Sequence, residues 1–347
     1  MITLARETRG LTQSGLADKL GITQGTLSKL ENQQAECSDE LLRKLSQVLS
    51  YPPDFFEREF TPGNLPPSFF RRYKTLSGSL IRRTRAELNI VRLHVHALVR
   101  SAELPINRVP VMDPDSEYDP EQCASDLRAA WRIPPGPIND LTGILEDNGI
   151  VIVSRPFRSN RLDGISTYDR EIDLPPIVLI NTTLPGDRLR FTLAHELAHI
   201  VLHSAQLIPH ADVEKEAHHF AAELLMPAVD IQDEFPKRLG LRALAHLKAR
   251  WGVSIQALIM RAEHVGKISD RQKRMLFAQM SRLGYRRTEP IEIPRDEPKL
   301  FRELIDFHLS ELDYTQEDLC RSLSIEPAEF QIRYINDKPF LRLLGPD

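Results

Sequence analysis

The stretch from Arg190 to His203 constrains this chain most, because apolar residues at helical spacing alternate there with histidines and a glutamate. With about 3.6 residues per turn of an α-helix, His195 and His199 lie one turn apart on the same face, where both imidazoles can bind one zinc ion. Glu196 lies about 100° further round the helix, beside an open coordination position at which a water molecule would need a general base. The competing interpretation is a buried helix whose histidines have no chemical role.

A zinc site of this type needs a third protein ligand, and the segment from Val213 to Pro227 is the natural source. Its apolar residues form one stripe of a second helix, which Pro227 ends. On a helical wheel Glu214 lies nearer the middle of this stripe than Glu216, so we favour Glu214 as the ligand and keep Glu216 as the alternate. His218 follows Glu214 by one turn, where it could orient a metal-bound histidine.

These two helices resemble the ImmA/IrrE family of zinc metallopeptidases. Two motifs carry the resemblance, His195-Glu196-x-x-His199 and Glu214-x-x-Ala217-x-x-Phe220-Ala221-x-x-Leu224-Leu225-Met226-Pro227. The resemblance covers roughly residues 105 to 270. It implies that two histidines and Glu214 hold Zn²⁺ in a gluzincin-like arrangement, that Glu196 is the general base, and that a transcriptional repressor is cleaved. Ala198 and His218 depart from the family pattern, which usually has glycine at the first position and Asn or Asp at the second.

Residues 1 to 60 are predicted to form a separate module with a helix, a turn and a second helix. Thr12 is the expected N-cap of the first helix, Gly21 ends it, and Thr23 caps the second. The two helices would pack through an apolar set consisting of Leu16, Ala17, Leu20, Ile22, Leu27 and Leu30. In such a pair the second helix offers its N-terminal polar side chains to the major groove of DNA.

This module is similar to the lambda-repressor-like, or XRE-type, family of DNA-binding domains. The resemblance implies that double-stranded DNA is a partner, and that the protein binds it as a homodimer. It places Gln13 near a phosphate, and it assigns four DNA-facing side chains, those of Gln24, Thr26, Ser28 and Lys29. Glutamine and threonine can contact base edges.

Charge is distributed unevenly over the first hundred residues. Residues 1 to 50 carry equal numbers of basic and acidic side chains, so this module alone should attract phosphates weakly. Residues 68 to 100 hold a strong excess of basic residues, among them Arg71, Arg72, Lys74, Arg82, Arg83, Arg85 and Arg92. This segment could supply the missing phosphate contacts or bind an acidic partner, or it could be a solvated helix face between two domains.

The predicted fold is mainly α with a small β-sheet, an α+β class in which a helix-turn-helix bundle precedes a zincin domain. Apolar runs at 149–153 and 176–180 indicate two buried strands, and 164–168 a third. An edge strand beside the zinc helix could hold an extended substrate through main-chain hydrogen bonds. The domain boundaries are expected at 1–60, 61–104 for a linker and basic helical segment, 105–270 for the peptidase domain, and 271–347 for a C-terminal helical region.

The C-terminal region contains a weak internal repeat of the N-terminal module. The segment from Thr315 to Ile325 shares the apolar frame of the segment from Thr12 to Ile22, which predicts the same helix-turn-helix packing. Glu326, Pro327 and Glu329 stand at its would-be DNA-contacting positions. Because acidic residues repel phosphates, we interpret the copy as a degenerate module that makes dimer or domain contacts.

Composition is ordinary, with 41% hydrophobic residues, 27% charged residues and a net charge of −4, and no long apolar run predicts a membrane span. Cys37, Cys123 and Cys320 lie far apart and are odd in number, which indicates a reducing compartment. A cytoplasmic, prokaryotic protein is therefore expected. Its predicted function is that of a DNA-binding regulator that cleaves a regulatory protein under stress. The alternatives are a transcription factor whose zinc domain senses a signal without cleaving, and a DNA-binding protein with a vestigial site.

Overall fold

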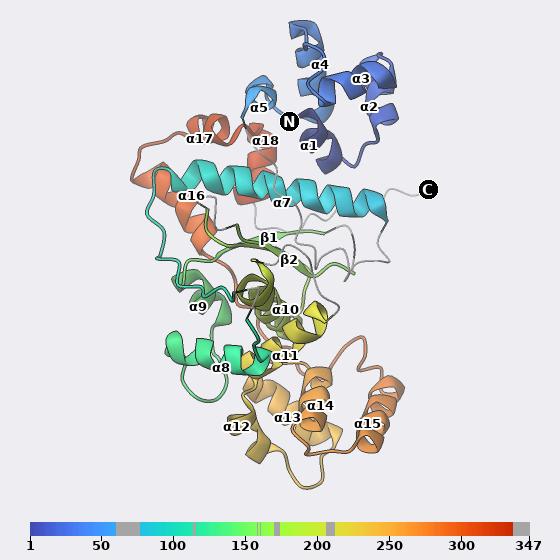
Figure 1. Cartoon of the computed structure of the whole chain (residues 1–347), viewed down its shortest axis with the longest axis vertical. Helices are drawn as coiled ribbons and strands as arrows, with labels where there is room; N and C mark the ends of the chain where they lie inside the picture. Colours follow the sequence, from blue (N-terminus) through green and yellow to red (C-terminus); the bar gives the residue numbers. More distant parts are fainter. Residues whose placement is uncertain are drawn as a thin grey trace. The chain divides into compact units, whose positions relative to one another are not determined.

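The computed structural model describes residues 1–59, 77–113, 116–157, 159, 161–169, 174–205 and 212–335. These residues form two compact units, which can be followed by colour along the chain in Figure 1. The first unit is discontinuous in sequence and contains residues 1–59, 77–104 and 301–335, and the second contains residues 105–300. No helix within the described ranges is both long enough and apolar enough to span a membrane.

The first unit begins with five short helices. They are α1 (Ile2–Thr8), α2 (Gln13–Leu20), α3 (Gln24–Glu31), α4 (Asp39–Leu49) and α5 (Pro53–Glu57). The caps predicted from the sequence are confirmed, because the Thr12 and Thr23 hydroxyls accept hydrogen bonds from the backbone N–H groups of Gly15 and Thr26. Gly21 ends α2 with a φ of 70°, a left-handed conformation that favours glycine.

A long helix, α7 (Gly78–Val99), completes the core of this unit. Its residues Ala86, Ile90 and Leu93 join the buried leucines of α2, α3 and α4 in one apolar cluster. The basic residues of α7 are partly engaged within the unit. Arg85 lies 3.3 Å from the Glu7 carboxylate, and Arg92 is buried, so these two are structural, whereas Arg71, Arg72 and Lys74 lie outside the described residues.

The C-terminal repeat has the local geometry of the N-terminal helix pair. The C-terminal region contains α16 (Leu300–Ser310), α17 (Gln316–Leu323), α18 (Pro327–Phe330) and the π-helix η3 (Gln331–Ile335), and the repeat begins with α17. The Thr315 hydroxyl caps α17 as Thr12 caps α2, and Ser324 ends α17 in a left-handed conformation with a φ of 49°. The second helix of the copy, α18, has four residues and continues directly into the π-helical turn η3, whereas all eight residues of α3 are α-helical.

This copy packs against the N-terminal helices of its own chain, and a role in dimer contacts stays a prediction. Arg9 of the first module lies 3.2 Å from Glu329, at the position equivalent to Thr26. Glu329 also accepts a hydrogen bond of 2.7 Å from Arg333, and the Ser324 hydroxyl donates to Asp54 at 2.6 Å. The acidic side chain at a would-be DNA-contacting position is therefore occupied by an internal ion pair.

The Glu329 pairs predict that docking of the C-terminal copy depends on pH. Burial opposes ionisation of Glu329, but Arg333 and Arg9 outweigh it and hold the pKa of the carboxyl below its ordinary value. A carboxylate with a lowered folded-state pKa contributes stability that is present above its unfolded pKa, about 4.3, and is lost as the pH falls through the folded pKa. We expect amide protection of residues 301–335 in hydrogen-exchange mass spectrometry to decrease below about pH 4.

Glu329→Gln should lower this protection at neutral pH and reduce its dependence on acid, whereas Glu317→Gln, at an exposed position of α17, should change neither. An identical pH profile in the wild type and in Glu329→Gln would show that the ion pairs do not hold the copy in place.

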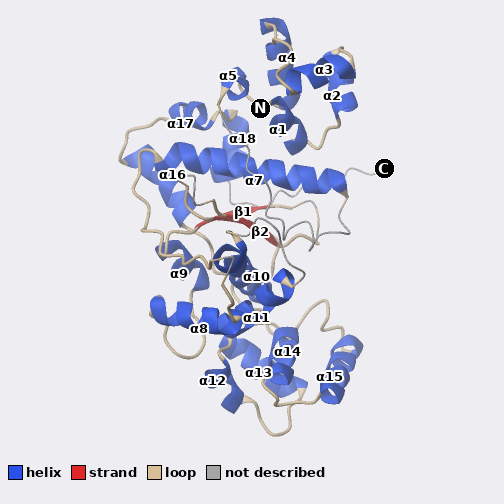
Figure 2. Cartoon of the chain, viewed as in Figure 1, coloured by secondary structure: helices blue, strands red, loops and turns tan. Residues whose placement is uncertain are grey.

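The second unit contains the predicted small sheet, drawn in red in Figure 2. Its strands are β1 (Val151–Arg155), β2 (Gly164–Thr167) and β3 (Ile177–Asn181), in the order β1-β3-β2. β1 runs parallel to β3 with Val151 opposite Ile177, and β2 runs antiparallel with Ile165 opposite Leu179. All three strands were expected from the sequence, and the α+β class is confirmed.

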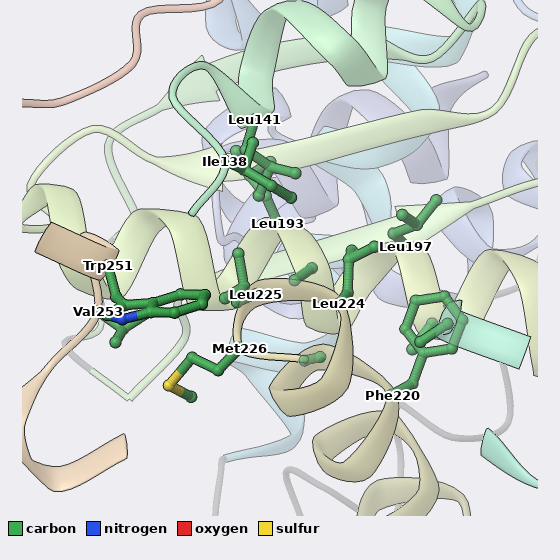
Figure 3. Packing of buried hydrophobic residues seen from close by; sticks show 14 of the residues in the cluster. Ile138, Leu141, Leu193, Leu197, Phe220, Leu224, Leu225, Met226, Trp251 and Val253 are labelled. Atoms are coloured by element: carbon green, nitrogen blue, oxygen red, sulfur yellow. The ribbon is translucent and has the colours of Figure 1, made fainter. Parts of the chain in front are cut away.

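The second unit also contains ten helical segments in its described residues. They are α8 (Pro120–Ala130), α9 (Leu141–Asp147), α10 (Gly186–Ala198), η1 (His199–His203), α11 (Val213–Leu225), α12 (Ala228–Ile231), η2 (Gln232–Glu234), α13 (Leu241–Trp251), α14 (Ile255–His264) and α15 (Asp270–Arg282). Of these, α9, α10 and η1 contact the sheet. Figure 3 shows how Leu193 and Leu197 of α10 lie near Leu224 and Leu225 of α11 in the buried core. The apolar stripe predicted for α11 is buried in full.

Buried ion pairs hold α10 in place. Lys248 of α13 binds Asp187 at the start of α10 at 2.5 Å, and Arg190 binds Asp296 at 2.6 Å. These pairs, together with the core, fix the helix that carries the histidine motif. The Asp187 side chain is therefore engaged in holding the start of α10.

Candidate metal centre

The histidine motif lies across a change in helix type. α10 ends at Ala198, and the next residues, His199–His203, form the π-helical turn η1. A π-helical turn is wider than an α-helical one and is frequent at functional sites. His195, Glu196 and His199 are all buried. The motif is thus buried inside the unit, on α10 and η1.

Three predicted metal ligands converge at this point. The Nε2 atoms of His195 and His199 lie 3.1 Å apart. Each Nε2 atom lies 3.4 Å from one oxygen of the Glu214 carboxylate, which α11 supplies. All three ligand atoms lie within 4.8 Å of one another. Two imidazole nitrogens and a carboxylate oxygen form a donor set that suits zinc, so the residues fit the ion that the sequence predicted.

The alternate ligand, Glu216, faces a different partner. Its Oε2 atom lies 3.0 Å from His203 Nε2 and accepts a hydrogen bond of 2.9 Å from the Tyr118 hydroxyl. The Nδ1 atom of His203 lies 3.0 Å from Nδ1 of His199. One assignment of the imidazole protons satisfies these hydrogen bonds. In it, His199 donates from Nδ1 to Nδ1 of His203, and His203 donates from Nε2 to Glu216. It leaves the Nε2 lone pair of His199 directed at the metal position.

The candidate general base, Glu196, accepts a hydrogen bond from a residue of the sheet. Ser166 of β2 is buried, and its hydroxyl donates a hydrogen bond of 2.8 Å to Oε2 of Glu196. β2 approaches α10 closely at Gly164, where a Cβ atom would lie 2.8 Å from the Thr192 side chain and 3.4 Å from that of Glu196. Glycine at this position therefore permits the contact that brings Ser166 to Glu196.

His218 makes a contact that the sequence did not specify. Its Nδ1 donates a hydrogen bond of 2.6 Å to the backbone carbonyl of Glu214, one turn earlier on α11. Its ring lies 4.7 Å from the His195 ring, at an interplanar angle of 76°. An orienting role for His218 stays a prediction, and the observed contact with His195 is an edge-to-face packing of the two rings.

Sequence reasoning missed three side chains of this centre. His203 was assigned no role in the predicted site, although its spacing of four residues from His199 is a usable signal. Ser166 and Tyr118 are brought to the site by β2 and by the segment before α8, so local spacing gave no indication of either.

Four of the DNA-facing residues predicted in the first unit lie along α3, and Gln13 begins α2. Gln24, Thr26 and Lys29 are exposed, and Ser28 is half-buried. The Gln24 amide donates to Oε1 of Gln13 at 3.4 Å, and the Gln13 amide donates to Glu31 at 2.7 Å. These hydrogen bonds hold Gln13 and Gln24 side by side at the N-terminal ends of α2 and α3.

Comparison with family models agrees with both the helix-turn-helix arrangement of the first unit and the histidine motif of the second. Residues 2–56 match the helix-turn-helix model, and residues 145–263 match the model of the IrrE N-terminal-like domain, a peptidase family. The chain joins an XRE-type helix-turn-helix domain to an IrrE-like domain. The match to the IrrE-like domain includes the histidine motif and Glu214, whereas Tyr118 lies before it. No curated protein matches the chain.

The electrostatics of the IrrE-like domain suit a cation. Burial opposes ionisation of Glu214, but the imidazoles of His195 and His199, each 3.4 Å from a carboxylate oxygen, outweigh it and hold the pKa of this carboxyl well below its usual range. Glu214 is therefore a carboxylate, the form in which a glutamate binds metal. In this domain the candidate metal ligands and the candidate general base come from α10, η1 and α11, and β2 supplies the Ser166 hydrogen bond to Glu196.

Proposed function

We propose that this protein is a DNA-binding transcription regulator whose IrrE-like domain is a zinc-dependent endopeptidase that cleaves a repressor or another regulatory protein under stress. One observation carries the proposal. Three ligand atoms of His195, His199 and Glu214 lie within 4.8 Å of one another, and the buried Glu196 follows His195 on the same helix. The proposal includes a cytoplasmic location in a prokaryotic cell and a homodimer on DNA.

In this mechanism His195, His199 and Glu214 would hold the metal. When bound, zinc polarises a peptide carbonyl and lowers the pKa of a water molecule. Glu196 takes a proton from the attacking water and passes it to the leaving amine, and the Ser166 hydroxyl keeps the Glu196 carboxylate in position. β2 is an edge strand of the described sheet, where an extended peptide can add through main-chain hydrogen bonds.

The proposal is tested with a library of proteome-derived peptides. Protein stripped of metal with a chelator and then reloaded with zinc should cut the library, and the stripped protein should not. New termini are identified by mass spectrometry. A zinc-loaded protein that cuts neither this library nor proteins of a cell lysate would replace the peptidase by the alternative, a transcription factor whose zinc domain senses a signal or is vestigial.

DNA binding gives an independent prediction. Gln24→Ala should cost about 1–3 kcal/mol of binding free energy on the preferred sequence, because an amide contact to a base edge is lost. Lys29→Ala should weaken binding to all sequences equally and reduce the salt slope by about 1. Sequences are first selected from a random oligonucleotide pool, and affinity is then measured by fluorescence anisotropy.

Glu36→Gln changes an exposed residue beyond α3 and serves as the control. Unchanged affinity and sequence preference in Gln24→Ala would remove α3 from DNA recognition.

A further inference from the structure

A second group of metal-binding side chains lies outside the centre described above. Glu121 of α8, His219 of α11 and His264 of α14 place their ligand atoms within 4.8 Å of one another. The Oε1 atom of Glu121 lies 3.0 Å from His219 Nδ1 and 2.6 Å from His264 Nε2. Both imidazoles thus point a nitrogen at the same carboxylate oxygen.

The other oxygen of Glu121 is engaged on its opposite side. Its Oε2 atom lies 3.5 Å from Nη1 of Arg261, a buried residue whose Nε donates to the Met226 carbonyl. The Arg261 guanidinium also pairs with the buried Glu223, so Glu223 compensates the charge of Arg261. Arg261 therefore orients the Glu121 carboxylate through Oε2 and leaves Oε1 facing the two histidines, as outer partners do for ligating carboxylates in metal sites.

The three side chains are presented by rigid, packed helices. Ala124 lies one turn after Glu121, Phe220 follows His219, and Ala262 precedes His264 by two positions, and all three apolar residues belong to the buried core. The metal-binding side chains form the rim of this core and remain accessible, since 22%, 34% and 42% of the side chains of Glu121, His219 and His264 are exposed. Ligands on helices whose packing is fixed lose little freedom on binding an ion.

The ordinary interpretation of this group is an ion pair between one carboxylate and two imidazoles. Both histidines would then have to carry a proton on the nitrogen that faces Glu121. A divalent cation between the three groups replaces both hydrogen bonds at once and needs neither proton. Imidazole nitrogens suit zinc, copper and nickel, and three protein ligands leave further positions to solvent.

We propose that Glu121, His219 and His264 form a second site for a divalent transition metal ion of the zinc class. The ion joins α8, α11 and α14, and so fastens the helix pair α13–α14 to the helix that supplies Glu214. This proposal does not depend on the peptidase activity, since none of its ligands belongs to the histidine motif.

The experiment measures zinc stoichiometry on the full chain by equilibrium dialysis and elemental mass spectrometry. The wild type should bind about two zinc ions, and the variant His195→Ala/His199→Ala about one. Adding His264→Ala or His219→Ala to that variant should abolish the remaining ion. His246→Ala, at an exposed histidine of the neighbouring α13, is the matched control and should leave it in place.

A second readout uses stability. Zinc should raise the melting temperature of His195→Ala/His199→Ala, because an ion that binds only the folded state stabilises it, and His264→Ala should remove this shift. The proposal is overturned if the His195→Ala/His199→Ala variant binds no zinc, or if His264→Ala and His219→Ala retain as much zinc as their parent. Failure of the peptidase site alone would instead leave one zinc in the wild type that depends on His264.

Discussion

Glu196→Gln is expected to abolish peptide cleavage while the zinc content remains at the wild-type level. Glutamine has nearly the same shape as glutamate, and the Ser166 hydroxyl can still donate to its amide oxygen. A neutral amide cannot accept a proton from water, so the loss of rate should be about 10²–10⁴-fold, the usual contribution of a general base. Cleavage is followed by the appearance of new peptide termini, and zinc is measured on the same sample.

Two companion variants make this result specific. Glu292→Gln changes an exposed carboxylate of the same unit and should leave both quantities unchanged. Ser166→Ala keeps the Glu196 carboxylate but removes its hydrogen-bond donor, so a smaller loss of rate is expected. Full cleavage by Glu196→Gln would show that another group takes the proton, and loss of zinc from this variant would make Glu196 part of the metal centre.

Local sequence patterns predicted the elements of this protein well, because caps and periodicity act over a few residues. Thr12 and Thr23 form the expected caps, and the apolar stripe of α11 is buried as its spacing required. The convergence of His195 and His199 follows from a single helical turn. The choice between Glu214 and Glu216 depended on a difference within one stripe, and the structure places only Glu214 beside both histidines.

Contacts between distant segments could not be predicted in this way. Tyr118 reaches Glu216 across nearly a hundred positions, and Ser166 reaches Glu196 because β2 pairs beside α10. The C-terminal repeat was visible as a pattern, but its docking on Arg9 depends on how residues 320 positions apart pack together. Each of these contacts depends on tertiary packing, which has no period in the sequence.

Glu214→Ala is expected to eliminate zinc from the histidine centre, whereas Glu216→Gln should keep the ion and bind it more weakly. Removing Glu214 takes away one of three ligands and the only negatively charged one among them. Glu216 acts through His203 on the orientation of His199, and loss of such an outer partner usually costs about 10–100-fold in metal affinity. Affinity is measured by competition with a chromogenic chelator, on a His264→Ala background that removes the second proposed site.

Tyr118→Phe extends this test along the same chain of hydrogen bonds. It removes one donor to Glu216 and leaves the His203–Glu216 contact in place, so its effect on affinity should be smaller than that of Glu216→Gln. The loss of zinc affinity should therefore decrease from Glu214→Ala through Glu216→Gln to Tyr118→Phe. Glu214 is the proposed ligand, Glu216 orients His199 through His203, and Tyr118 acts only on Glu216. If Glu216→Gln released zinc completely and Glu214→Ala retained it, the two glutamates would exchange roles, and α11 would have to turn to bring Glu216 to the histidines.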